Sequence, residues 1–165
     1  MEYLVFFGAA IQCFGIFTYL KSIFFGNTQP NRVSWLMWSL APLITAAAAF
    51  SDGVRLGVLP TFMAGFGSLI IFSSTFFIKK SYWKLSNFDY LCGVTSLLAL
   101  ILWWITKNAS IAIIFAILSD FIAGFPTAAK AWSHPKTESG LIFFMGILSF
   151  CTTFFTIKTW TFPEY

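Results

Sequence analysis

The residue of this sequence best suited to take part in chemistry is Asp120, an acidic residue inside a long apolar stretch. The segment from Ser119 to Glu138 begins with this carboxylate, contains Pro126 and ends in a short basic loop. A charged side chain in the core of a lipid bilayer costs about 3 kcal/mol or more, so Asp120 needs a partner, a proton or water. We expect it to couple a proton or to bind a solute. The alternative is a structural carboxylate that is hydrogen-bonded to a neighbouring helix.

Other polar residues and two prolines interrupt the apolar stretches. Gln12 and Thr18 lie in the first stretch and could bind a polar solute, or could form hydrogen bonds between helices. Pro126 and Pro42 each lie within an apolar stretch, where proline leaves a backbone carbonyl without its helical donor. Both prolines are candidate hinges, and the alternative is that they are tolerated kinks.

The composition places the chain in a lipid bilayer. Hydrophobic residues make up 58% of the 165 positions and charged residues only 10%, whereas about a quarter of a soluble domain is charged. The apolar stretches between the charges approach the length of about 20 residues that a helix needs to cross a membrane. The net charge of +4 is spread over short loops, which indicates membrane topology and not nucleic-acid binding.

The apolar stretches predict an all-α integral membrane protein with six transmembrane helices, which forms one polytopic domain over 1–165. The predicted spans are 3–25, 33–50, 56–78, 88–105, 109–132 and 141–159. Seven of the ten lysine and arginine residues follow the first, third and fifth spans. The positive-inside rule then places both termini outside the cytoplasm, and we assign the chain to a bacterial cytoplasmic membrane.

Two parts of the sequence match each other after a shift of 109 positions. Both matching parts are a helix that ends in lysine, a turn that contains proline, and a second helix. Parallel repeats of this kind are one plan of membrane transporters, with the solute site near the midplane between the repeats. The matched pairs are Gly15 with Gly124, Thr18 with Thr127, Lys21 with Lys130, and Thr28 with Thr137.

The segment 125–139 resembles the PQ-loop motif of the SWEET and SemiSWEET sugar transporters. Pro126-Thr127 occupies the Pro-Gln position, Lys130 the basic position and Ser139 the position of the serine that opens the next helix. In the first repeat, Phe17-Thr18 takes the place of Pro-Gln. The resemblance implies a three-helix bundle at 3–78, a linker helix at 88–105 and a partial second bundle at 109–159, and it adds Thr127 to the candidate solute-binding residues.

The function that we expect is a carrier that moves a small polar solute, with a sugar among the candidates, by alternating access. Asp120 would couple the movement to protons, and a homodimer would cover the incomplete second bundle. The alternative is a non-transporting membrane scaffold or accessory subunit. A carrier predicts a cavity that joins Asp120, Gln12 and Thr18, whereas a scaffold predicts tight packing there.

Enzyme function is not expected, because the motifs of common active sites are missing. The sequence contains no glycine-rich phosphate loop, no cluster of metal-ligating residues and no serine-histidine-acid set. We therefore predict no cofactor and no metal. Trp35 and Trp38, at the start of the second span, are interpreted first as part of an interfacial aromatic belt; for Trp38 the alternative is stacking on a sugar ring.

Overall fold

The computed structural model describes residues 3–51, 53–78, 82–106 and 109–155, and it is helical. Each predicted span corresponds to a helix, which confirms the all-α class, while residues 156–159 of the last predicted span lie outside the described residues. Turns of 3-10 helix occur at Leu56–Val58, Pro135–Thr137 and Thr152–Phe155. The helices are α1 (Leu4–Phe24), α2 (Arg32–Ser51), α3 (Leu59–Phe77), α4 (Asn87–Thr106), α5 (Ala109–Ser133) and α6 (Gly140–Cys151).

Three helical segments are long and apolar enough to cross a membrane: Leu4–Phe24, Leu56–Phe77 and Asn87–Thr106. A shorter apolar segment covers Gly140–Phe155. Large apolar side chains point outward: Phe17 exposes 65% of its surface and Ile147 exposes 62%. Small polar side chains are buried instead, among them Ser34, Ser39, Ser96 and Ser119. Apolar residues outside and polar residues inside are the distribution that a helical bundle has in lipid.

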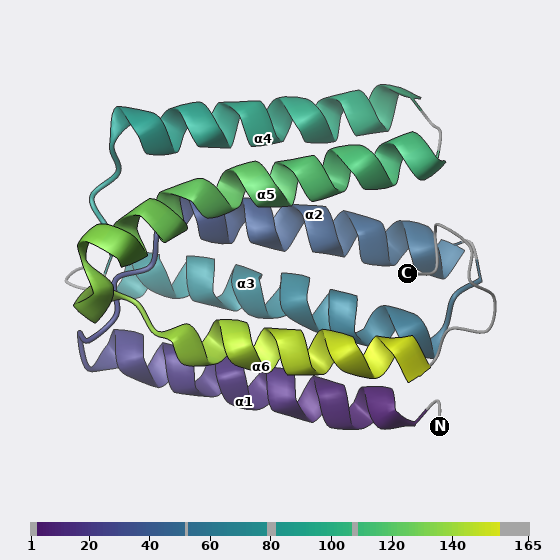
Figure 1. Ribbon diagram of the computed structural model, residues 1–165, viewed down its shortest axis with the longest axis horizontal. Helices are drawn as coiled ribbons and strands as arrows, with labels where there is room; N and C mark the ends of the chain where they lie inside the picture. Colours follow the sequence, from purple (N-terminus) through teal and green to yellow (C-terminus); the bar gives the residue numbers. More distant parts are fainter. Residues whose placement is uncertain (1–2, 52, 79–81, 107–108, 156–165) are drawn as a thin grey trace.

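The six helices lie side by side along their lengths (Figure 1). Helix α3 packs against both α1 and α2, whereas α6 packs against α1 and α5 packs against α2. Helix α4 covers the outer side of α5. The loops α1–α2, α3–α4 and α5–α6 meet at one end of the bundle, which we call the α5–α6 loop end. The α2–α3 loop and the start of α1 lie at the opposite end, which we call the α2–α3 loop end (Figure 1).

Side-chain caps fix where helices begin and end at the α5–α6 loop end. Asn31 Oδ1 accepts hydrogen bonds from the backbone N–H groups of Val33 (3.0 Å) and Ser34 (3.3 Å), which satisfies free donors at the start of α2. Ser86 and Asp89 cap α4 reciprocally: the Ser86 N–H donates to Asp89 Oδ2 (2.5 Å), and the Asp89 N–H donates to Ser86 Oγ (3.4 Å). Helix α1 ends at Phe24, and Gly26, two residues later, has a φ of 74°, which suits glycine.

Close helix contacts occur where α1 lacks a side chain. A Cβ at Gly8 would lie 2.1 Å from Thr152 Oγ1 and 2.9 Å from the backbone oxygen of Ser149. Seven residues further along α1, a Cβ at Gly15 would lie 3.0 Å from Met145 Cβ. Both glycines face α6, so they allow the first and the last described helices to approach each other closely.

Candidate functional site

A cavity of about 360 Å³ lies between α1, α2, α3 and α6. Most of its wall is apolar, as in many ligand-binding pockets. Gln12 from α1, Trp35 and Trp38 from α2, Ser68 from α3 and Gly146 from α6 are part of the lining. Because four helices contribute to it, a relative movement of these helices changes the shape of the cavity.

One buried polar atom in this lining, the side-chain oxygen of Gln12, is an acceptor with no hydrogen-bond partner in the described part of the chain. Gln12 exposes 7% of its surface. The indole Nε1 of Trp35, a donor, is also buried, but it is directed at the hydroxyl of Tyr19. Buried polar groups are normally paired, because leaving one unpaired costs about 1–3 kcal/mol. A polar ligand in the cavity could pair with the Gln12 oxygen.

Aromatic rings form one side of the cavity. The ring centroids of Trp35 and Trp38 are 5.3 Å apart in an edge-to-face arrangement, and those of Trp38 and Phe143 are 5.8 Å apart. The prediction that Trp35 belongs to an interfacial belt is wrong, because this side chain is buried. Trp38 is also turned toward the cavity and not only toward the membrane surface. Sequence reasoning missed Trp35 as a site residue, because residue type alone does not show which side of the helix faces inward.

Asp120 lies outside the lining of the cavity but is linked to it through Trp38. The indole Nε1 of Trp38 donates a hydrogen bond to the backbone oxygen of Asp120 over 3.2 Å. The α5 backbone comes close to the same ring, since a Cβ at Gly124 would lie 3.6 Å from Trp38 Cζ2. The Oδ1 atom of Asp120 is buried and has no hydrogen-bond partner among the described residues. Trp38 therefore connects the cavity to the backbone of Asp120.

The two predicted threonines also lie outside the cavity. Thr18 Oγ1 donates to the backbone oxygen of Gly15 in its own helix, over 2.9 Å. Thr127 is buried, and its Oγ1 has no partner within the described ranges. Of the four predicted solute-binding or proton-coupling residues, only Gln12 lines the cavity. The expected cavity that joins Asp120, Gln12 and Thr18 is thus not formed, and the roles of Asp120, Thr18 and Thr127 stay predictions.

The two prolines lie inside helices as expected, Pro42 in α2 and Pro126 in α5. At Pro42 the neighbouring helix is very close, since a Cβ at Gly65 of α3 would lie 2.9 Å from the backbone nitrogen of Leu43. Nothing in the geometry tests a hinge movement, so both hinges stay predictions.

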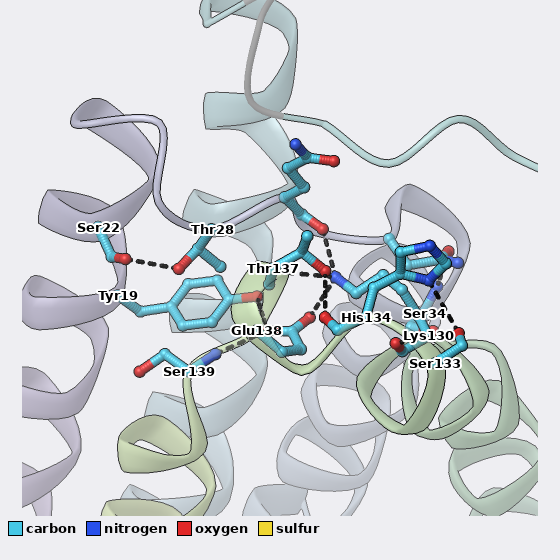
Figure 2. Close-up of polar contacts among 12 residues, drawn as sticks. Tyr19, Ser22, Thr28, Ser34, Lys130, Ser133, His134, Thr137, Glu138 and Ser139 are labelled. Carbon is cyan, nitrogen blue, oxygen red and sulfur yellow. Dashed lines mark hydrogen bonds and ion pairs between the residues drawn. The ribbon is translucent and has the colours of Figure 1, made fainter.

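A buried ion pair lies at the α5–α6 loop end, and sequence reasoning did not anticipate it. Lys130 Nζ and Glu138 Oε1 are 2.7 Å apart, with 1% and 5% of their side chains exposed. The hydroxyl of Tyr19 donates to Glu138 Oε2 over 2.7 Å (Figure 2). Lys130 Nζ also donates to the backbone oxygens of Gln29 and Thr137. We call these five residues the Lys130–Glu138 cluster.

Comparisons with protein-family models, with curated proteins and with solved structures give no match. Among the described residues, no group of three or more His, Cys, Asp or Glu side chains could hold a metal ion. The fold and the site therefore define, at the level of class, an all-helical bundle with apolar outer surfaces and a half-open cavity between α1, α2, α3 and α6.

Proposed function

We propose that this protein is an integral membrane carrier for a small polar solute and that the cavity between α1, α2, α3 and α6 is its solute site. The observation that carries the proposal is the unpartnered buried oxygen of Gln12 in the lining of the cavity. A solute with a hydroxyl or amide N–H group would satisfy this oxygen, while the rings of Trp38 and Phe143 would cover its apolar faces.

The distribution of side chains supports a protein embedded in a bilayer. Three helical segments have the length and hydropathy of transmembrane helices. We propose that all six helices span a bacterial cytoplasmic membrane, with both termini outside the cytoplasm. The count of positive charges behind this orientation includes Lys79, Lys80, Lys107 and Lys158, which lie outside the described residues.

The helix contacts support a PQ-loop, SWEET-like arrangement. In that arrangement α1 and α2 correspond to α5 and α6. If the two halves are equivalent, the contact between α1 and α6 in one half-pair must be matched by a contact between α5 and α2. Both contacts are present. Helix α3 packs on α1 and α2, in keeping with a first three-helix bundle, and α4 would be the linker helix. A homodimer that covers the second bundle remains part of this proposal.

The cavity at Gln12 supports the carrier over the scaffold, although it does not extend to Asp120 or Thr18. A scaffold has no need for unpaired polar atoms between its helices, because each such atom lowers its stability. For proton coupling we propose Asp120: its carboxyl group is on α5, and its backbone oxygen binds the ring of Trp38 that lines the cavity. A change in the charge of Asp120 would then be felt at the solute site through this ring.

Uptake by proteoliposomes tests the proposal. We would offer panels of neutral sugars, polyols and zwitterionic amino acids to the intact protein, with and without an imposed pH gradient. Gln12→Leu should lower uptake of the transported solute about tenfold, because it removes the polar partner that the lining offers. Ser74→Ala is the matched control, since the Ser74 hydroxyl only donates to the backbone oxygen of Ile71 in α3.

Asp120→Asn separates coupling from binding. The pH gradient should drive uptake by the native protein and have no effect on this variant, while solute binding persists. Absence of uptake for every solute with correctly folded protein would contradict the carrier and favour the scaffold.

A further inference from the structure

The Lys130–Glu138 cluster lies directly beyond the cavity, at the α5–α6 loop end. Its Tyr19 is 1% exposed, and the Tyr19 ring centroid is 4.9 Å from that of Trp35. Trp35 in turn lines the cavity. A continuous path of contacts therefore runs from Glu138 through Tyr19 and Trp35 to the solute site.

The hydrogen bonds of the cluster connect two parts of the chain that are far apart in sequence. Tyr19 of α1 donates to Glu138, which lies in the loop between α5 and α6. Lys130 of α5 donates to the backbone oxygen of Gln29, which lies in the loop between α1 and α2. In the same place the Gln29 N–H donates to the Thr137 oxygen over 3.0 Å. Figure 2 shows Tyr19, Lys130, Thr137 and Glu138 converging between the two loops.

The ion pair itself does not cross between these parts. Lys130 and Glu138 both belong to the α5–α6 segment and would move together. Separating this segment from α1 and α2 therefore breaks the hydrogen bonds of Tyr19 and Gln29 but leaves the two charges paired. Breaking a buried pair by removing one partner is strongly destabilising, and this geometry avoids that cost. The cluster can open and close without leaving an isolated charge in the interior.

We propose that the Lys130–Glu138 cluster is the gate between the solute cavity and the membrane face at the α5–α6 loop end. In this structure the gate is closed. It opens when the α5–α6 segment moves away from α1 and from the α1–α2 loop, which draws Glu138 from Tyr19 and uncovers Trp35. The inference rests on the proposed carrier function, because the gate would control the access of solute to the same cavity.

Side-specific labelling of a single cysteine tests the gate. The parent protein would carry Ser68→Cys in the cavity wall and alanine at Cys13, Cys92 and Cys151. A charged, membrane-impermeant methanethiosulfonate reagent would be added separately to each face, in right-side-out and inside-out vesicles. The variants are Tyr19→Phe, which removes one hydrogen bond between the two parts, and the double variant Lys130→Met with Glu138→Gln, which removes both charges together. The control is Thr95→Ala, because the Thr95 hydroxyl donates to the backbone oxygens of Leu91 and Cys92 in its own helix, α4, and lies outside the cluster.

We expect labelling from the α5–α6 loop end to rise about tenfold in Tyr19→Phe and more in the double variant, since one hydrogen bond to a charged group is worth at least that factor. Labelling from the opposite face should stay the same or fall, and Thr95→Ala should label like the parent. Unchanged labelling in both folded variants would overturn the gate, and so would an equal rise from both faces, which indicates general loosening. A one-sided rise without uptake of any solute would support the gate and contradict the carrier.

Discussion

The two ends of the helix bundle are held together by different kinds of contact. At the α5–α6 loop end, hydrogen bonds and an ion pair connect residues from distant parts of the chain, as in Tyr19 with Glu138. At the α2–α3 loop end, the loop forms local backbone bonds, such as Gly53 N–H to Phe50 oxygen (3.2 Å), and the Arg55 guanidinium lies over the Phe50 ring. There α1 and α6 meet through the close contact at Gly8.

This difference suggests a division of roles between the ends. Hydrogen bonds are directional, so the α5–α6 loop end has a distinct closed state and a distinct open state. The close packing of α1 on α6 at Gly8 allows one helix to slide slightly along the other, but it leaves no room for added atoms. A second apolar cavity, of about 440 Å³, lies at the α2–α3 loop end and is lined by Phe6, Phe50 and Phe62 among others. We infer that the α2–α3 loop end acts as the pivot while the other end opens.

The largest expected effect comes from removing one member of the ion pair. Lys130→Met alone leaves the Glu138 carboxylate buried beside only its hydrogen-bond donors, Tyr19 and the Ser139 N–H. We expect the free energy of unfolding in detergent to fall by about 3–5 kcal/mol. The double variant with Glu138→Gln should recover most of this loss. Equal losses in the single and double variants would show that the two charges are not coupled.

At the opposite end, Gly8→Ala should also destabilise the protein, but by overpacking. The new methyl group would collide with Thr152 and with the backbone at Ser149, at a cost of about 1–3 kcal/mol. Gly140→Ala is the matched control, because nothing lies within 4 Å of its Cβ position. Thermal unfolding of the two variants side by side checks the prediction, which fails if the two melting temperatures agree.

Tyr19→Phe should have a smaller effect on stability. It removes one hydrogen bond to Glu138 Oε2, which keeps the Ser139 N–H as a donor, and it leaves the ring contact with Trp35 in place. We expect a loss of about 1.5 kcal/mol in the free energy of unfolding. A loss as large as that of Lys130→Met would mean that the hydroxyl, and not the ion pair, holds this end closed.

The smallest expected change in stability belongs to Gln12→Leu, in the cavity between the two ends. This variant removes a buried oxygen that has no partner among the described residues. Stability should stay the same or rise by about 1 kcal/mol, although uptake of solute is lost. A clear loss of stability would assign Gln12 a structural hydrogen bond and weaken its role in solute binding.

The sequence was sufficient to predict the helices, because long apolar stretches separated by turn residues are a local signal. Helix α1 ends one residue before its predicted end, and α4 begins one residue before its predicted start. The last predicted span changes its helix type: α6 ends at Cys151 and a 3-10 turn covers Thr152–Phe155, while residues 156–159 lie outside the described residues. Apolar residues continue after Cys151, as at Phe154 and Phe155, so hydropathy alone gave no sign of this change.

Prediction of the site was less complete, because burial depends on distant parts of the chain. Gln12 was found since a polar amide within an apolar stretch stands out in the sequence. Lys130 was interpreted as the basic residue of the motif and as a charge near a loop, and its burial was missed because that burial depends on Gln29 and Tyr19, which come from the opposite part of the chain. One sequence pattern could have indicated the Lys130–Glu138 pair. A lysine and a glutamate lie on either side of a short turn, and each lies next to an apolar helix.

The close contact of α1 with α6 also has a consequence for biosynthesis. The face of α1 that contains Gly8 and Gly15 is completed by the last helix to be described. During translation α1 is made before α6, so this face stays uncovered until α6 has followed. Gln12 lies on the same face, and its side-chain oxygen is 3.7 Å from the Cβ position of Gly146 in α6. The wall of the cavity beside Gln12 is therefore completed only after α6 has been made.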